Sequence, residues 1–151
     1  MTPIVFTILG EPASKANSRE IVIIGGRPSV IKSKKALAFE ADALRQIPPA
    51  ARQQLNCPVR ATLRIFYASE RPDLDESIVL DVMQNRYKTV GKGEAKQRLL
   101  VQKGGYVNDR QVREKHIFHG IDRANPRTEV IIEPLIDAMP HTQPALFEEV
   151  A

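Results

Sequence analysis

A strict alternation over residues 59–67, VRATLRIFY, is the feature that most limits what this chain can fold into. An extended chain turns successive side chains to opposite faces, so Arg60, Thr62 and Arg64 share one face of this segment. We therefore predict a strand with one buried face, which another layer of the protein must cover. The buried face is predicted to consist of Val59, Ala61, Leu63, Ile65 and Tyr67.

The N-terminal third predicts a strand, a hairpin and a helix. Residues 3–9, PIVFTIL, are rich in strand-forming residues and stop at Gly10. Two β-branched segments flank Gly25 and Gly26, which suit a two-residue hairpin turn. Ser33 is a suitable helix N-cap, and the helix after it should end at a Pro-Pro pair. Its predicted apolar stripe consists of Leu37, Ala41 and Leu44.

The middle of the chain predicts a short helix and then an insertion. Residues 86–105 are basic and contain several glycines, and we expect an inserted excursion with a helix over residues 94–102. Residues 106–120 and 127–135 predict two more strands, the second clearly alternating. The short helix, ending near Gln84, is predicted from Ile78, Val79, Val82 and Met83.

The length of 151 residues, 42% of them hydrophobic, suits one ordinary domain. We expect an α+β domain over residues 1–135, with a mixed or antiparallel sheet of four to six strands and two or three helices. A flexible acidic tail is expected at 136–151. Because no apolar run approaches the ~18 residues of a membrane span, no signal-peptide pattern opens the chain, and Cys57 is the single cysteine, we expect a cytoplasmic protein with no membrane partner.

Charge is distributed unevenly along the chain. Residues 1–127 hold 22 basic and 13 acidic groups, whereas residues 128–151 hold five acidic groups and no basic one. A basic body attracts polyanions such as nucleic acid, although a basic face is also commonly plain solvated surface. In the tail, Gln143, Leu146 and Phe147 resemble the peptides that bind the bacterial sliding clamp; the other interpretation is an ordinary tail that packs one Phe.

Acidic residues interrupt the basic body directly after residues 59–67. Because Pro72 favours an extended backbone before it, the chain is expected to be still extended at Asp73. Asp73 and Asp75 then point to the same side, and two carboxylates so close favour a hard cation such as Mg²⁺ or Mn²⁺. The other interpretation is a helix start, with Asp73 as N-cap and Glu76 completing a capping box.

Two further acids follow along the chain. Asp109, in VNDRQV, lies just before a predicted strand and is either a turn residue or a third ligand. Asp81 lies six residues after Asp75, and on one helix the two would be about 120° apart around the axis. We therefore leave Asp81 out of the predicted ligand set.

The segments GEPASKANSR, PDLD and NDRQV, in this order, resemble the RusA family of Holliday junction resolvases over roughly residues 4–133. The resemblance implies a RusA-like fold, a homodimer, and Mg²⁺ or Mn²⁺ held by the catalytic residues Asp73, Asp75 and Asp109. The chain departs from the family where Val79 stands in place of a Lys, Glu76 stands in place of an Asn and residues 86–105 lengthen a brief segment. Replacements considered for that Lys are Lys88, Lys92, Lys103 and Lys115.

The activity that the resemblance implies is hydrolysis of phosphodiesters in four-way junctions or other branched DNA. Two alternatives stay open: a phage or bacterial protein of this fold that binds junctions without cutting them, and a phosphodiesterase for flap DNA. His116 and His119 would lie on opposite faces of a strand, so we expect no shared zinc site. Contacts to DNA are expected from Lys15, Asn17, Arg19, Arg71, Arg110 and Arg113.

Overall fold

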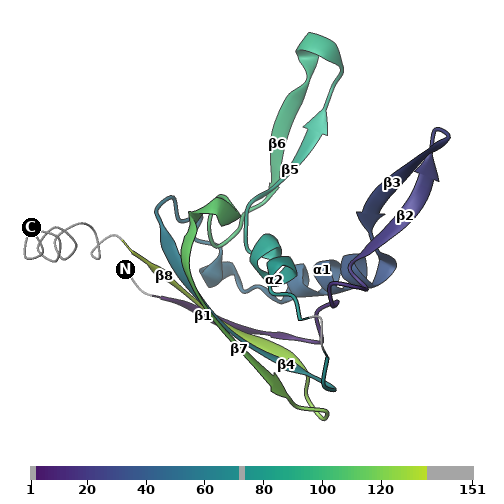
Figure 1. Ribbon diagram of the computed structural model, residues 1–151. Helices are drawn as coiled ribbons and strands as arrows, with labels where there is room; N and C mark the ends of the chain where they lie inside the picture. The colour runs from purple at the N-terminus through teal and green to yellow at the C-terminus, as the bar shows by residue number, and fades with distance from the viewer. Residues whose placement is uncertain (1–2, 72–73, 136–151) are drawn as a thin grey trace, which may run out of the picture.

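The computed structural model describes residues 3–71 and 74–135 (Figure 1). A four-stranded sheet carries two α-helices on one face, and two hairpins project from the side of the helices, which confirms the predicted α+β domain. The elements are β1 Ile4–Leu9, β2 Arg19–Ile24, β3 Arg27–Lys32, α1 Lys34–Gln46, β4 Val59–Tyr67, α2 Ser77–Val82, β5 Arg86–Val90, β6 Gln97–Gln102, β7 Val112–Ile121 and β8 Arg127–Pro134.

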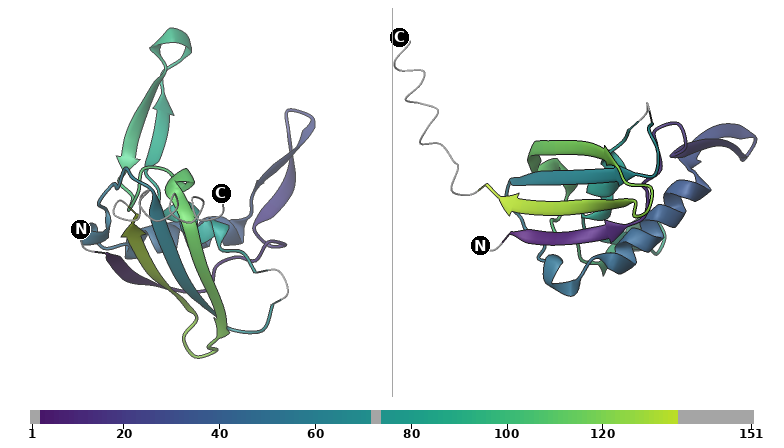
Figure 2. Two further views of the ribbon diagram at one scale, coloured as in Figure 1. Left: turned by 60° about the vertical axis from the view of Figure 1, so that its left-hand side comes forward. Right: turned by 90° about the horizontal axis from the view of Figure 1, so that it is seen from below.

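The main sheet has the order β1-β8-β4-β7, as the right-hand view of Figure 2 shows, in which the four strands lie side by side. It is a mixed sheet, because β4 runs parallel to β7 and antiparallel to β8. With the two hairpins the described strands number eight, more than the predicted four to six, because each hairpin forms a separate two-stranded sheet. The predicted buried face of β4 is confirmed, since its alternate residues from Val59 to Tyr67 are at most 1% exposed.

The two helices cover this buried face and close the core. The predicted N-cap of α1 is confirmed, because Ser33 Oγ accepts a hydrogen bond from Ala36 N at 3.1 Å. The predicted stripe on α1 is wrong at Leu37, which is 49% exposed, and at Ala41, whereas Leu44 is partly buried against the core. The residues that the helix buries are Ala36, Phe39, Glu40 and Ala43. The buried side of α1 includes the charged residue Glu40, so it does not form a continuous apolar pattern in the sequence. In α2 the predicted apolar residues are buried.

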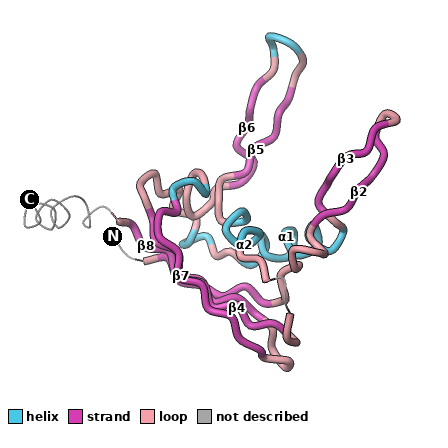
Figure 3. The backbone as a smooth tube through the Cα atoms, in the orientation of Figure 1, coloured by secondary structure: helices cyan, strands magenta, loops and turns pink. Residues whose placement is uncertain are grey.

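The two hairpins differ in how well the sequence predicted them. Gly25 and Gly26, at φ 57° and 78°, form the predicted turn between β2 and β3. The helix predicted over residues 94–102 is wrong, because the chain turns back at Gly91 and Gly93 and β6 pairs with β5 (Figure 3). A side chain on Gly91 would meet Ala95 O at 2.4 Å, so this turn requires glycine. Cross-strand pairing therefore overrides the helical preference of the segment.

A buried tyrosine fixes α2 to the segment that returns from the second hairpin. The hydroxyl of Tyr106 donates to Leu80 O, and the whole side chain is inaccessible to solvent. Burial raises the pKa of Tyr106, because the ionised form would lose its hydration. The carbonyl of Met83 accepts from Gly105 N at 2.7 Å, so main chain and side chain hold the same junction.

None of the helices within the described ranges is long and apolar enough to cross a membrane. Cys57 is a free thiol, partly buried against the core. The predicted acidic tail, with its clamp-like Gln143, Leu146 and Phe147, lies outside the described residues.

Replacing Tyr106 by Phe tests the junction between α2 and the returning segment. Tyr106→Phe removes one buried donor, and we expect the free energy of unfolding in urea to fall by about 0.5–1.5 kcal/mol. Tyr87→Phe is the matched control, because the Tyr87 hydroxyl is on an exposed side chain and, among the described residues, accepts only a long hydrogen bond from Asn85 at 3.4 Å. Equal stability of the two variants would contradict this role of Tyr106.

Candidate active site

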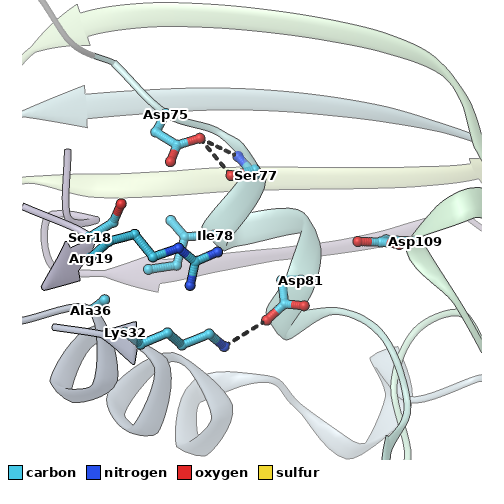
Figure 4. A pocket seen from close by; sticks show the side chains of 9 residues that line it. All are labelled: Ser18, Arg19, Lys32, Ala36, Asp75, Ser77, Ile78, Asp81 and Asp109. Atoms are coloured by element: carbon cyan, nitrogen blue, oxygen red, sulfur yellow. Dashed lines mark hydrogen bonds and ion pairs between the residues drawn. The ribbon is translucent and has the colours of Figure 1, made fainter. Parts of the chain in front are cut away.

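Acidic and basic side chains from distant parts of the chain meet in a pocket of about 210 Å³. Asp75 comes from the segment before α2, Asp81 from α2 itself, and Asp109 from the 3-10 turn before β7 (Figure 4). Two basic residues of the first hairpin, Arg19 and Lys32, enter from the opposite side. The described residues that line it are Ser18, Arg19, Lys32, Ala36, Asp75, Ser77, Ile78, Asp81 and Asp109.

Asp75 is held at the start of α2. Its Oδ1 accepts hydrogen bonds from Ser77 N at 3.0 Å and from Ser77 Oγ at 2.6 Å. The helix begins at Ser77, and Glu76, which precedes it, makes no side-chain cap. The capping box with Glu76 as its third helical residue is therefore not how α2 begins, and Asp73, its other member, lies outside the described residues.

Gln84 connects the other two acids of the pocket. Its Nε2 donates to Asp81 Oδ1 at 2.8 Å, and its Oε1 accepts from Asp109 N at 3.1 Å. Asp109 itself is exposed, in a turn capped by Asn108. The side-chain amide of Gln84 therefore links the end of α2 to the turn that contains Asp109.

Asp81 and Gln84 are site residues that the sequence interpretation missed. The angular argument against Asp81 assumed that Asp75 lies on the same helix, but Asp75 precedes α2. A spacing of four places Ser77 and Asp81 on the same side of α2. Since Ser77 also binds Asp75, the i, i+4 relation was the signal that could have found Asp81.

A network of four charges lies beside the pocket. The Glu40 carboxylate, 12% exposed, accepts from Lys32 Nζ at 2.6 Å and pairs with the Arg86 guanidinium. Asp81 Oδ2 lies 3.3 Å from Lys32 Nζ and 3.8 Å from Arg86 Nη1. These residues come from β3, α1, β5 and α2, so the network joins the roots of both hairpins to both helices.

The carboxylate oxygens of the pocket are of the kind that binds magnesium, but the carboxylates lie too far apart in this structure to hold one ion together. Carboxylate oxygens are the hard ligands that Mg²⁺ and Mn²⁺ prefer, and Asp75, Asp81 and Asp109 supply them. Within residues 3–71 and 74–135, no three His, Cys, Asp or Glu side chains are grouped closely enough to hold a metal ion. Asp81 is already paired with two cations, so a metal ion would compete with Lys32 for it.

The residues predicted to contact DNA are divided among three places. Arg19 lines the acid pocket, and Lys15 and Asn17 are exposed in the turn just before it. Arg71 pairs with Glu11, which also accepts from Ala68 N at 2.8 Å, so one carboxylate binds both ends of residues 68–71.

Two of the predicted DNA contacts lie on the other side of the Asp109 turn. Arg110 and Arg113 line a separate pocket with Asn108, and Arg110 Nε donates to Asn108 Oδ1 at 3.2 Å. They are therefore not part of the acid pocket. The two histidines have separate contacts, His116 with Glu114 and His119 with Tyr67.

Lys32 is the lysine that lines the acid pocket. Val79 is fully buried in α2, so its side chain does not reach the pocket. None of the four lysines considered as replacements for the family Lys lines the pocket. One of them, Lys115, has its Nζ 3.6 Å from Glu76 Oε1. Lys32, which contacts Asp81 at 3.3 Å, comes from β3, far from α2 in the sequence.

Comparisons of the chain with protein-family models and with curated proteins return no match. The functional argument therefore depends on the residues of the pocket and their contacts.

Replacing Glu40 tests whether the charge network stabilises the domain. Glu40→Gln removes one of the two anions that Lys32 and Arg86 share, the other being Asp81. We expect the free energy of unfolding to fall by about 1–3 kcal/mol, less than for a wholly buried pair because both cations are partly exposed. The matched control is Asp42→Asn, which removes an exposed pair on the same helix and should cost about 0.5 kcal/mol or less. Similar urea midpoints for both variants would contradict the account.

Proposed function

We propose that the protein is a magnesium-dependent, structure-selective endodeoxyribonuclease of the RusA type, which resolves Holliday junctions or other branched DNA. The observation that supports this most is the common pocket of Asp75, Asp81 and Asp109 with Arg19 and Lys32. Carboxylates that share a pocket with cations suit a metal ion and a phosphate at the same place.

The proposed roles follow from where each side chain lies. Asp75, Asp81 and Asp109 would hold Mg²⁺ or Mn²⁺, with Asp73 as the further ligand expected from the sequence. A bound ion of this kind lowers the pKa of its water and offsets negative charge on the phosphate. Arg19 supplies a guanidinium that can donate two parallel hydrogen bonds to a phosphate group.

Lys32 has a second proposed role as the cation nearest the scissile phosphate. A positive charge there stabilises the charge that develops on the phosphoryl oxygens. Its contacts with Glu40 and Asp81 keep the ammonium at the edge of the pocket. This role replaces the one that the missing family Lys would have at Val79.

DNA outside the pocket has two proposed contact regions. Lys15 and Asn17 lie beside Arg19, and Arg110 and Arg113 lie beyond the Asp109 turn. Such contacts to phosphates orient the substrate. The cytoplasm is the proposed compartment, and docking of the tail on a sliding clamp stays a proposal.

Cleavage of a fluorescent four-way junction in the presence of Mg²⁺ tests the proposal. We expect the wild type to cut, and Asp75→Asn and Asp109→Asn each to lower the rate by about 100-fold or more through loss of a metal ligand, while junction binding in EDTA persists. Asp42→Asn, on the exposed side of α1, is the charge-matched control and should cut normally.

The second candidate function is a junction-binding protein without catalysis. The observation that favours it is the buried Val79, together with the pairing of Asp81 to two cations. A wild type that binds the junction but does not cut it with Mg²⁺ or Mn²⁺ would favour this candidate. Competition between junction and flap substrates separates a resolvase from a flap nuclease.

Self-association is part of the proposal, because a junction has two-fold symmetry and must be cut twice. A surface that supports it is the β2–β3 hairpin, where Ile21, Ile23 and Val30 share one face and are each at least 66% exposed. A second copy of the chain is the proposed occupant.

The double variant Ile21→Ser/Ile23→Ser should convert a dimer into a monomer in sedimentation equilibrium, and paired cuts into single nicks. Val5→Ser, which changes an exposed residue of β1, is the control and should leave the dimer intact. A dimer that survives the double variant would exclude this hairpin as the interface.

A further inference from the structure

The β5–β6 hairpin concentrates positive charge that no ion pair with another described residue neutralises. Among the described residues its exposed cations form no ion pair, and Glu94 is the one acid between Arg86 and Lys103. These cations are Lys88, Lys92, Lys96, Arg98 and Lys103. Like charges so close repel one another, and a polyanion would relieve that repulsion.

The hairpin does not serve the core. No residue of β5 or β6 belongs to the buried cluster, and the two strands pair with each other alone. Figures 1 and 2 show a narrow two-stranded ribbon that projects from the helical side of the domain. A two-stranded ribbon has the dimensions that the major groove of B-DNA admits.

The root of the hairpin is firmly held. Asn85, 7% exposed, accepts from Gly104 N at 2.7 Å across the base of the two strands. A side chain on Gly104 would meet Met83 O at 2.3 Å, so the two segments approach too closely for any other residue. Arg86 adds its ion pair with Glu40. The ribbon therefore has a defined direction relative to the acid pocket.

One face of the ribbon continues from the acid pocket. A second hollow, of about 290 Å³, is lined by Tyr87, Thr89 and Arg98 of the ribbon. It shares Lys32 and Asp81 with the acid pocket, so the two hollows adjoin.

Arg98 is oriented within this second hollow. Its guanidinium lies 4.0 Å from the centre of the Tyr87 ring, and Thr89 is its partner across the strands. Stacking on tyrosine restricts the arginine while leaving its N–H donors available to a phosphate.

We propose that the β5–β6 hairpin is a DNA-binding arm, which holds the duplex next to the scissile phosphate through Lys92, Lys96 and Arg98. The path of the bound duplex leads from the acid pocket, across Lys32, along the face of the ribbon that carries Tyr87, Thr89 and Arg98. This inference rests on the proposed function, and it names a contact surface for the same substrate.

The test compares two variants that lose the same charge. In Lys96→Gln/Arg98→Gln both changes are on the ribbon, two residues apart and so on the same side of the chain. In Arg45→Gln/Arg123→Gln both are on exposed residues that line neither hollow. Binding to a labelled four-way junction and to a labelled duplex is measured by fluorescence anisotropy in EDTA over a range of KCl concentrations. Thermal unfolding checks that both variants fold.

The ribbon variant should bind about 10-fold more weakly at physiological salt, and its slope of log K against log[KCl] should fall by about 1.8, because each lost phosphate contact removes about 0.9. The control variant should keep the wild-type slope. Equal slopes for the two variants would overturn the arm, even if Mg²⁺-dependent cleavage is found.

Failure of the nuclease proposal gives a different result. If the wild type binds DNA without cutting it, and the slope of log K against log[KCl] falls in the ribbon variant but not in the control variant, the DNA-binding arm is supported and catalysis is rejected. A wild type that binds neither the four-way junction nor the duplex overturns both the nuclease proposal and the DNA-binding arm.

Discussion

The buried carboxylate of Glu40 is the group on which the working surface of this protein depends. It neutralises Lys32 at the end of β3 and Arg86 at the start of β5, and both cations also approach Asp81. A carboxylate removed from water is stable only beside its cations. The roots of the two hairpins and one wall of the acid pocket are therefore fixed by a single set of charges, although they come from four separate elements.

The sequence was sufficient for those parts of the fold in which a local pattern decides the outcome. Alternation over β4 identified its buried face, and Gly25 and Gly26 identified the first hairpin, because both signals lie within a few residues. The β5–β6 hairpin was missed because residues 94–102 prefer a helix locally, and only pairing with a strand on the far side of the Gly91 turn overrides that preference.

The candidate site shows the same division between local and non-local information. Asp75 and Asp109 were expected to converge from a resemblance of short motifs, and both line the acid pocket. Lys32 and Gln84 were not foreseen, because their contacts join residues far apart in the chain. No periodicity or spacing reveals that a lysine at the end of a hairpin faces an acid on a helix. Charge compensation between elements is visible only after folding.

Crystals grown with Mn²⁺ and measured at the manganese absorption edge would test the central claim most directly. Bound Mn²⁺ has the ligand preferences of Mg²⁺ and gives an anomalous signal that locates it. The account predicts one peak in the acid pocket, coordinated by carboxylate oxygens of Asp75 and Asp109, and no such peak in Asp75→Asn. A manganese ion bound only elsewhere, or a pocket that stays without one while Lys32 remains on Asp81, would contradict it.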